Sequence, residues 1–200
     1  MTQIFFTSDT HFNHEVIIRY SQRPFADLSE MTEILVRNWN DRVGPGDIIY
    51  HLGDFAITFG PRRESKTVDD LLSRLNGNKF LILGNHDRKE VFQNRRWIKV
   101  VPYHEIKVDF EGTKRKIVLC HYPLRSWNRL QHGSWMLHGH CHGSLVDTGG
   151  GKIMDVGVDA HNFSPVGMKA ICEFMANREI VSHDHHGRRS KSQPQSGDST

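Results

Sequence analysis

The chain has 200 residues, of which 37% are hydrophobic and 24% are charged, as is usual for one globular domain. A net charge of +3 makes dedicated binding of duplex nucleic acid unexpected, because that function requires a concentrated basic surface. No apolar run reaches membrane-spanning length, no leader is recognisable, and 3 cysteines are too few for a disulfide framework. We therefore expect a cytoplasmic protein with no membrane partner, and the oligomeric state stays open.

Short apolar runs alternate with helical periodicities along the chain. In the first half, strands are predicted at residues 4–6, 48–50 and 80–83, and helices at 15–20, 29–42, 68–75 and 87–95, with Ser29 as the cap of the second helix. The second half is richer in strands, at 105–110, 117–120, 135–137 and 152–158, and it ends in a helix at 167–177. The dipeptide at 111–112 predicts a hairpin turn. This order predicts a layered α/β sandwich.

A polar cluster follows each of five apolar runs. The clusters are Asp9-Thr10-His11, Gly53-Asp54, Gly84-Asn85-His86-Asp87, His121-Tyr122-Pro123 and Gly139-His140-Cys141-His142-Gly143. Loops at the carboxyl ends of strands gather side chains from distant parts of an α/β chain into one site. If residues 137–143 are extended, His138, His140 and His142 share one face; if the chain bends at its glycines, the last two converge from a loop. Imidazoles beside carboxylates indicate a metal site.

In this order the five clusters resemble the motif series of the calcineurin-like metallophosphoesterase superfamily: Asp-x-His, Gly-Asp, Gly-Asn-His-Asp, a lone His and Gly-His-x-His. The match runs from Asp9 to His142. The segments at 8–14, 23–25 and 50–55 further resemble a small bacterial and phage-type branch of that superfamily. The resemblance implies a sandwich of two mixed β-sheets flanked by helices, with two metals at one sheet edge. We expect this domain to span residues 1–182, followed by a disordered polar tail at 183–200.

The resemblance also implies a ligand set for two divalent metal ions. One metal is expected on Asp9, His11, Asp54 and His142, and the other on Asp54, Asn85, His121 and His140. Asp54 is the shared ligand, and a carboxylate suits this role because its charge and two oxygens can bridge two cations. The oxygen and imidazole donors suit manganese, which we favour, or iron, zinc, nickel or cobalt. A hydroxide between the two metals is the expected nucleophile.

Further residues are assigned roles beside the metals. By resemblance, His86 is the catalytic histidine that assists the leaving oxygen, and Asp87 is expected to orient its ring. Arg23 and Arg88 are candidates to bind a substrate phosphate, because a guanidinium matches phosphate oxygens in a fork, although either could instead form a surface salt bridge. His14 is open to three readings: a substrate contact, a metal ligand or a residue at a helix start. The alternative for the seven predicted ligands is a structural role, in which their side chains form caps and turns at the strand ends.

These features predict a dinuclear-metal phosphoesterase acting on a phosphodiester, with a small nucleotide-type substrate as its partner. A small diester is favoured because the sequence has neither a long insertion that could dock a protein nor a strong basic patch that could bind duplex nucleic acid. The alternative is a phosphomonoesterase, of proteins or of small molecules, with the same site. A nuclease would need a groove of basic and aromatic residues, and a non-catalytic binding module would be expected to lack His86 or some of the ligands. Both are less favoured.

Overall fold

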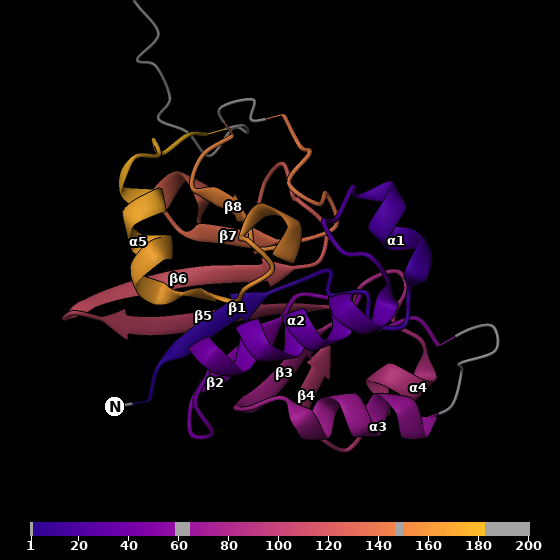
Figure 1. Cartoon of the computed structure of the whole chain (residues 1–200). Coiled ribbons are helices and arrows are strands. Elements are labelled where there is room, and N and C mark those ends of the chain that lie inside the picture. Colours follow the sequence, from indigo (N-terminus) through magenta and orange to yellow (C-terminus); the bar gives the residue numbers. More distant parts are fainter. Residues whose placement is uncertain (1, 59–64, 147–149, 183–200) are drawn as a thin grey trace, which may run out of the picture.

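The computed structural model describes residues 2–58, 65–146 and 150–182, which form two stacked β-sheets with helices around them (Figure 1). Each sheet contains parallel and antiparallel strand pairs, so the predicted sandwich of two mixed sheets is confirmed. The predicted disordered tail at 183–200 lies outside the described residues. The boundary at residue 182 therefore stays a prediction.

The first sheet has the strand order β4-β3-β2-β1-β9. Its parallel strands are β1 (Ile4–Thr7), β2 (Ile48–His51), β3 (Asn78–Ile82) and β4 (Trp97–Val101). The short edge strand β9 (Val166–Gly167) pairs antiparallel with β1. Because β1, β2 and β3 are parallel, their carboxyl ends lie at one edge of the sheet, where three of the predicted polar clusters begin.

The second sheet has the order β5-β6-β7-β8. Its strands are β5 (Tyr103–Phe110), β6 (Thr113–Cys120), β7 (Trp135–His138) and β8 (Ile153–Asp155). The predicted hairpin joins β5 to β6, and its turn residues Glu111 and Gly112 have φ values of 50° and 74°, as a two-residue hairpin turn requires. Strands β6, β7 and β8 are parallel, so the clusters that follow β6 and β7 also share an edge.

Five α-helices and two 3₁₀ helices surround the sheets in the described part of the chain. They are α1 (Glu15–Tyr20), α2 (Leu28–Arg42), α3 (Ser65–Arg74), α4 (Lys89–Phe92), η1 (Leu130–His132), η2 (Val158–Ala160) and α5 (Met168–Ala176). The cap of α2 is Asp27 and not the predicted Ser29, because the Asp27 carboxylate accepts from the Glu30 amide at 2.9 Å. Helix α4 is shorter than predicted, since Arg88 before it is extended. None of these helices is long and apolar enough to cross a bilayer.

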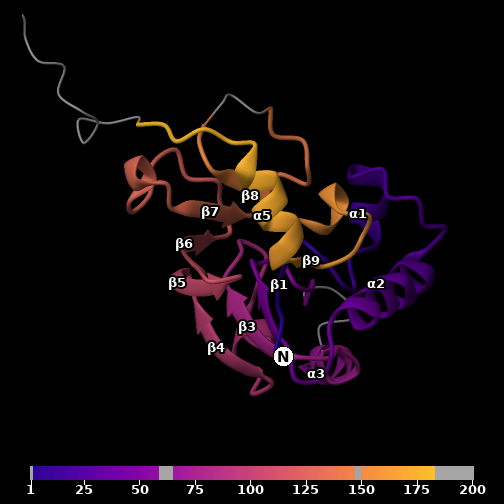
Figure 2. The same cartoon turned by 90° about the vertical axis from the view of Figure 1, so that its left-hand side faces the viewer.

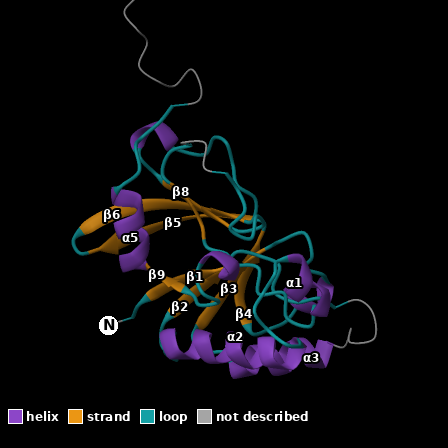
Figure 3. Ribbon diagram, turned by 45° about the horizontal axis from the view of Figure 1, so that its top comes forward, coloured by secondary structure: helices purple, strands orange, loops and turns teal. Residues whose placement is uncertain are grey.

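Neighbouring residues of β1 face different layers of the core. Phe5 is buried together with Leu35 of α2 and Leu72 of α3, on the outer face of the first sheet. Phe6 is buried with Leu137 and Met154 in the layer between the two sheets. This alternation follows from the pleat of a strand. Figure 3 shows α2 and α3 along the outer face of the first sheet, and Figure 2 shows α5 between β8 and β9.

Backbone contacts join the loops at the edge where the polar clusters lie, both within the first sheet and between the two sheets. The amide of Asp9, after β1, donates to the carbonyl of Gly53, after β2, at 3.0 Å. An isolated parallel bridge pairs Ser8 with Gly157, which follows β8 of the second sheet. The loops after the strands are thus held together by main-chain bonds, and side chains distant in sequence are brought to one place.

Candidate metal centre

The loops that carry the predicted ligands contain a concentration of left-handed backbone. A positive φ, between 49° and 71°, is found at Asp9, His11, Asp54, His140 and His142. This conformation is uncommon outside glycine, and each such residue costs on the order of 1–3 kcal/mol unless the surroundings stabilise it. Strain of this kind gathers at functional sites, where it allows nearby side chains of one loop to converge.

Three of the predicted ligands form the first donor group. The Nε2 atoms of His11 and His142 lie 3.9 Å and 3.8 Å from Oδ1 of Asp9, and the two rings stack with their centroids 5.2 Å apart. Within residues 2–58, 65–146 and 150–182, Asp9 Oδ1 and His11 Nε2 are buried without a hydrogen-bond partner. Buried polar atoms without partners are costly, and a cation between these two would satisfy both.

Asp54 lies at the centre of the site. Its Oδ1 accepts from the backbone amide of His86 at 2.8 Å, which fixes the carboxylate. Its Oδ2 lies 3.6 Å from Nε2 of His11 and 3.5 Å from Nε2 of His121. One oxygen of this buried carboxylate therefore faces imidazoles from two different loops.

The second donor group contains His121, Asn85 and His140. The Nδ1–H of His121 donates to the carbonyl of Leu52 at 2.7 Å, so in the neutral ring the lone pair is on Nε2. That Nε2 lies 3.0 Å from Oδ1 of Asn85, and Nδ1 of His140 lies 3.1 Å from the same oxygen. The lone pairs of His121 Nε2 and Asn85 Oδ1 thus face each other, an arrangement that a cation stabilises.

Burial sets the protonation of these donors. It raises the pKa of Asp9 to about 6, and it lowers the pKa of His11 well below its usual value. The pKa of His140 is also lowered, chiefly by burial. Neutral imidazoles are the form that binds metals, and a divalent cation would favour the ionised form of Asp9. The donor set and its orphaned buried atoms therefore fit divalent cations.

The predicted catalytic histidine lies at the open side of the donors. The side chain of His86 is 42% exposed, and its Nε2 is 4.0 Å from Oδ2 of Asp54. Asp87, in contrast, lies under the loop and accepts backbone amides: those of Asp54 at 3.0 Å, Phe55 at 2.9 Å and Gly84 at 2.9 Å. The contacts of Asp87 thus differ from the ring-orienting role that we predicted, because both of its oxygens are engaged in holding the loop backbone.

The predicted phosphate contact at Arg23 is wrong. Its side chain is buried, and its donors are all engaged inside the protein. Nε and Nη2 bind the two carboxylate oxygens of Asp159 at 2.8 Å each, and Nη1 and Nη2 donate to the carbonyls of Thr10 and Asp9 at 3.0 Å and 2.7 Å. The remaining Nη1 bond goes to the sulfur of Met31 at 3.5 Å. Arg23 therefore stabilises the site from within.

The other two predicted substrate residues lie closer to solvent. Arg88 is exposed and occupies the N-cap position of α4, directly after the loop that carries His86. His14 precedes α1, and its ring centroid is 5.3 Å from that of His11 and 6.5 Å from that of His86. Burial lowers the pKa of His14, and its Nδ1 has no hydrogen-bond partner among the described residues. Both residues stay candidates for substrate binding.

Comparison with known proteins identifies the family. A sequence profile of the calcineurin-like phosphoesterases matches residues 2–186. The chain belongs to this family. It is 33% identical over 186 residues to an uncharacterised protein of Methanocaldococcus jannaschii, covering 90% of this chain and 96% of that protein. It is also 29% identical over 192 residues to the gene 66 protein of Mycobacterium phage D29, covering 83% and 93%.

A solved structure supports the fold. The phosphoesterase superposes on a protein of unknown function from Aquifex aeolicus with a TM-score of 0.66 and 21% identity, over 87% of this chain and 100% of the other. The family match confirms the predicted superfamily, and it makes the protein a hydrolase of phosphoric esters that uses divalent metal ions.

An open groove of the phosphoesterase begins at the candidate metal centre. Its volume is about 960 Å³. It is lined by Ile17, Tyr20, Ser21, Gln22, His140, Cys141, His142, Ser144, Leu145 and Val146. Apart from the two histidines, which are predicted ligands, the described residues of this lining include no aspartate, glutamate, lysine or arginine. A substrate that reaches the donors along this groove meets an uncharged and partly apolar wall.

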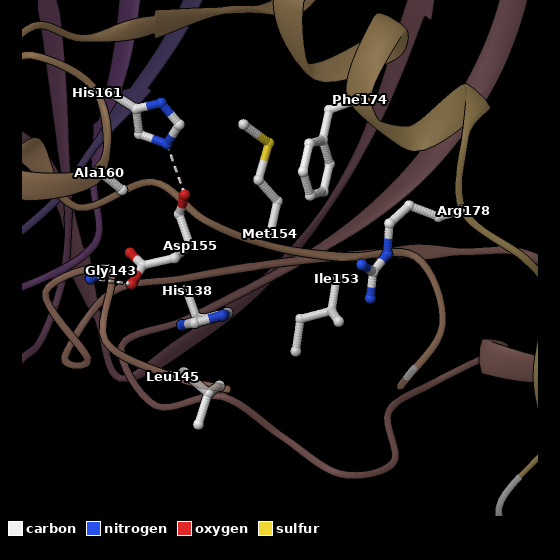
Figure 4. A pocket seen from close by; sticks show the side chains of 10 residues that line it. All are labelled: His138, Gly143, Leu145, Ile153, Met154, Asp155, Ala160, His161, Phe174 and Arg178. Carbon is white, nitrogen blue, oxygen red and sulfur yellow. Dashed lines mark hydrogen bonds between the residues drawn. The ribbon is translucent and has the colours of Figure 1, made fainter. Parts of the chain in front are cut away.

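Two carboxylates that the sequence did not single out support the loop that carries His140 and His142. Asp159 of η2 accepts from Nδ1 of His142 at 2.6 Å. Asp155, at the end of β8, accepts from the amide of Gly143 at 3.0 Å, beside a cavity of about 350 Å³ behind the loop (Figure 4). The sequence signal for both residues is the polar segment at 155–162, which overlaps the end of the predicted strand at 152–158 and could equally be a plain turn.

Proposed function

We propose that this phosphoesterase holds two divalent cations and hydrolyses a phosphodiester with small, nucleotide-type ester groups. The observation that carries the proposal is the position of Asp54. Its Oδ2 is 3.6 Å and 3.5 Å from imidazole nitrogens of His11 and His121, which belong to different donor groups. A carboxylate that faces both donor groups could serve as a ligand shared by a pair of cations.

The residues would divide between the two cations as follows. Asp9, His11, Asp54 and His142 would hold one, and Asp54, Asn85, His121 and His140 would hold the other. When bound, the two cations polarise the phosphoryl oxygens and lower the pKa of a water near them. Manganese is the favoured metal, because the donors are oxygen and imidazole with no thiolate among them.

The remaining side chains would act on the ester. His86 is exposed at the side of Asp54 Oδ2, so it can donate a proton to the leaving oxygen, and such assistance contributes on the order of 10²–10⁴ in rate. His14 and Arg88 would contact the phosphate oxygens from the solvent side. Asp87 would keep the loop of His86 in place through its three backbone bonds.

The groove supports a diester with a neutral organic group. Phosphate itself is anionic, and it would sit at the cations; the group beyond it would lie along Ile17, Tyr20 and Leu145. A nucleobase or another flat apolar group can pack on the exposed ring of Tyr20. A polynucleotide would bring further phosphates into a groove whose described lining residues include no lysine or arginine, so a nuclease is disfavoured.

We also propose that the protein works in the cytoplasm. Cys120, Cys141 and Cys172 are free thiols, a state that suits a reducing compartment.

The assay strips the protein of metal, reloads it with manganese, and compares p-nitrophenyl phosphate with bis(p-nitrophenyl) phosphate. Turnover of the diester well above the monoester, lost in His86→Ala and kept in the exposed control His132→Ala, supports the proposal. Preference for the monoester would overturn the diester assignment in favour of a phosphomonoesterase. No metal-dependent turnover of either ester by a protein with two bound cations would count against the whole proposal.

The groove is tested with Tyr20→Ala and, as a matched surface control, Tyr103→Ala on β5. If the organic group packs on Tyr20, the KM for the aromatic diester rises about fivefold, corresponding to about 1 kcal/mol of aromatic contact, while kcat changes little. An unchanged KM in Tyr20→Ala would place the organic group elsewhere.

A further inference from the structure

We propose that Asp159 and Arg23 are a positioning pair for His142, and that the affinity of the first cation depends on them. This inference rests on the proposed metal site, but it concerns two residues outside the ligand set. Both lie beneath the donors, and neither would touch the substrate or a cation.

The first step is the contact between Asp159 and His142. A carboxylate oxygen of Asp159 lies 2.6 Å from Nδ1 of His142. Since an ionised carboxylate can only accept, the hydrogen is on Nδ1, and the lone pair of the neutral ring is on Nε2. That Nε2 faces Asp9 Oδ1 at 3.8 Å. The bond therefore selects the tautomer, and it turns the free nitrogen toward the first donor group.

The second step is the clamp that Arg23 forms on Asp159. The guanidinium binds both carboxylate oxygens at 2.8 Å, in the planar fork geometry that lysine cannot reproduce. The side chain of Arg23 is fully buried and that of Asp159 is 7% exposed, so water competes weakly for these bonds. The direction of the Asp159 carboxylate is thus fixed by Arg23, and its Oδ2 contacts both Arg23 and His142.

The guanidinium of Arg23 also contacts the other ligand loop, which carries Asp9 and His11. Arg23 also donates to the carbonyls of Asp9 and Thr10, at 2.7 Å and 3.0 Å. One guanidinium therefore holds the backbone beside Asp9 and His11 and, through Asp159, the ring of His142. Since His142 has a φ of 49°, its loop is strained and needs such contacts to keep its geometry. The pair thus joins the two loops of the first donor group.

A simpler reading is a buried ion pair that only stabilises the fold. The Ser21 hydroxyl is a second neighbour of His142 Nδ1, at 3.3 Å, and it offers a matched control. This contact is longer than the one to Asp159, and it leaves Arg23 untouched. We therefore compare Asp159→Ala and Asp159→Asn with Ser21→Ala.

The first readout is manganese affinity, measured by competition with a chromophoric chelator. Asp159→Ala is expected to weaken one of the two sites about tenfold to a hundredfold, the usual effect of removing a carboxylate behind a ligating histidine. Asp159→Asn keeps an acceptor for Nδ1–H and should lose less, and Ser21→Ala should bind almost as the unchanged protein does. Equal affinity of both sites in Asp159→Ala and the unchanged protein would overturn the inference.

The second readout needs no metal. Two-bond ¹H–¹⁵N correlations of the His142 ring, recorded on the metal-free protein at alkaline pH, report which nitrogen carries the hydrogen. We expect the Nδ1–H form in the unchanged protein and in Ser21→Ala, and a mixture or the Nε2–H form in Asp159→Ala. If the protein did not bind two cations, the proposed function would fail. This readout would still test whether Asp159 positions the ring of His142. An unchanged tautomer in a folded Asp159→Ala would refute the positioning role.

Discussion

The buried histidine at the end of β2 makes the fold sensitive to acid. His51 is completely buried, and its ring lies between aromatic neighbours, with centroids 6.3 Å from Trp39 and 5.3 Å from Phe55. Its Nε2 contacts the hydroxyl of Thr10 at 3.0 Å, and that hydroxyl donates to the Phe55 carbonyl at 2.8 Å. The hydroxyl hydrogen is thus already used, so Nε2 of His51 is the donor. Burial lowers the pKa of this imidazole from 6.5 to about 3.

The magnitude follows from these two pKa values. Below pH 6.5 the unfolded chain takes up a proton on His51, whereas the folded chain stays neutral down to about pH 3. The unfolded state therefore binds more protons, and the free energy of unfolding falls as the pH falls through this range. Between pH 7.5 and pH 5 the loss from this one residue amounts to about 2 kcal/mol.

The prediction is tested with His51→Gln, whose amide nitrogen can still donate to Thr10 but cannot titrate. Urea unfolding of metal-free protein is measured at pH 7.5 and at pH 5 for both proteins. The unchanged protein should lose about 2 kcal/mol more than the variant over this interval, whatever their stabilities at pH 7.5. Equal losses would mean that His51 takes up its proton in the folded state too, and they would contradict the lowered pKa of His51.

Two other substitutions probe the core and the site. Leu137→Ala, at a fully buried position between the sheets, should lower the free energy of unfolding by about 2–5 kcal/mol in urea titrations. Leu145→Ala, at a position that is 53% exposed, should change it little. Similar effects of the two substitutions would contradict the placement of Leu137 in the core between the sheets. Gly139→Ala places a methyl group against the Ser8 side chain and the Asp9 carboxylate, so chelator competition should show weaker manganese binding. Gly150→Ala meets no atom of the described residues within 4 Å and should bind manganese normally. Unchanged binding in Gly139→Ala would contradict the role of Asp9.

Much of the fold could be predicted because its determinants are local. The helix at 15–20 is found at α1 as predicted, and the hairpin around residues 111–112 follows from turn chemistry that permits positive φ. The edge strand β9 could not be predicted, since a two-residue pairing leaves no pattern. The cap of α2 was misplaced because Asp27 and Ser29 are both good capping residues, and only the Glu30 bond distinguishes them.

The candidate site, too, could be predicted only in part from the sequence. The motif order predicted the donors, and the structure brings these side chains together. It also resolves the alternatives left open for the glycine-flanked histidines: β7 ends at His138, so His140 and His142 project from a loop. The roles of Arg23 and Asp87 could not be read from the sequence. Both are polar residues near a ligand motif, and only the fold shows that their groups are directed inward, to Asp159 and to backbone amides.

Counting bound metal tests whether the Asp54 carboxylate serves two cations. We would load the unchanged protein, Asp54→Ala and the exposed control Asp109→Ala with manganese, remove free metal, and measure bound metal per chain. We expect two cations per chain in the unchanged protein and in Asp109→Ala, with both sites lost or strongly weakened in Asp54→Ala. A folded Asp54→Ala that retained either site at full affinity would contradict the shared-ligand assignment.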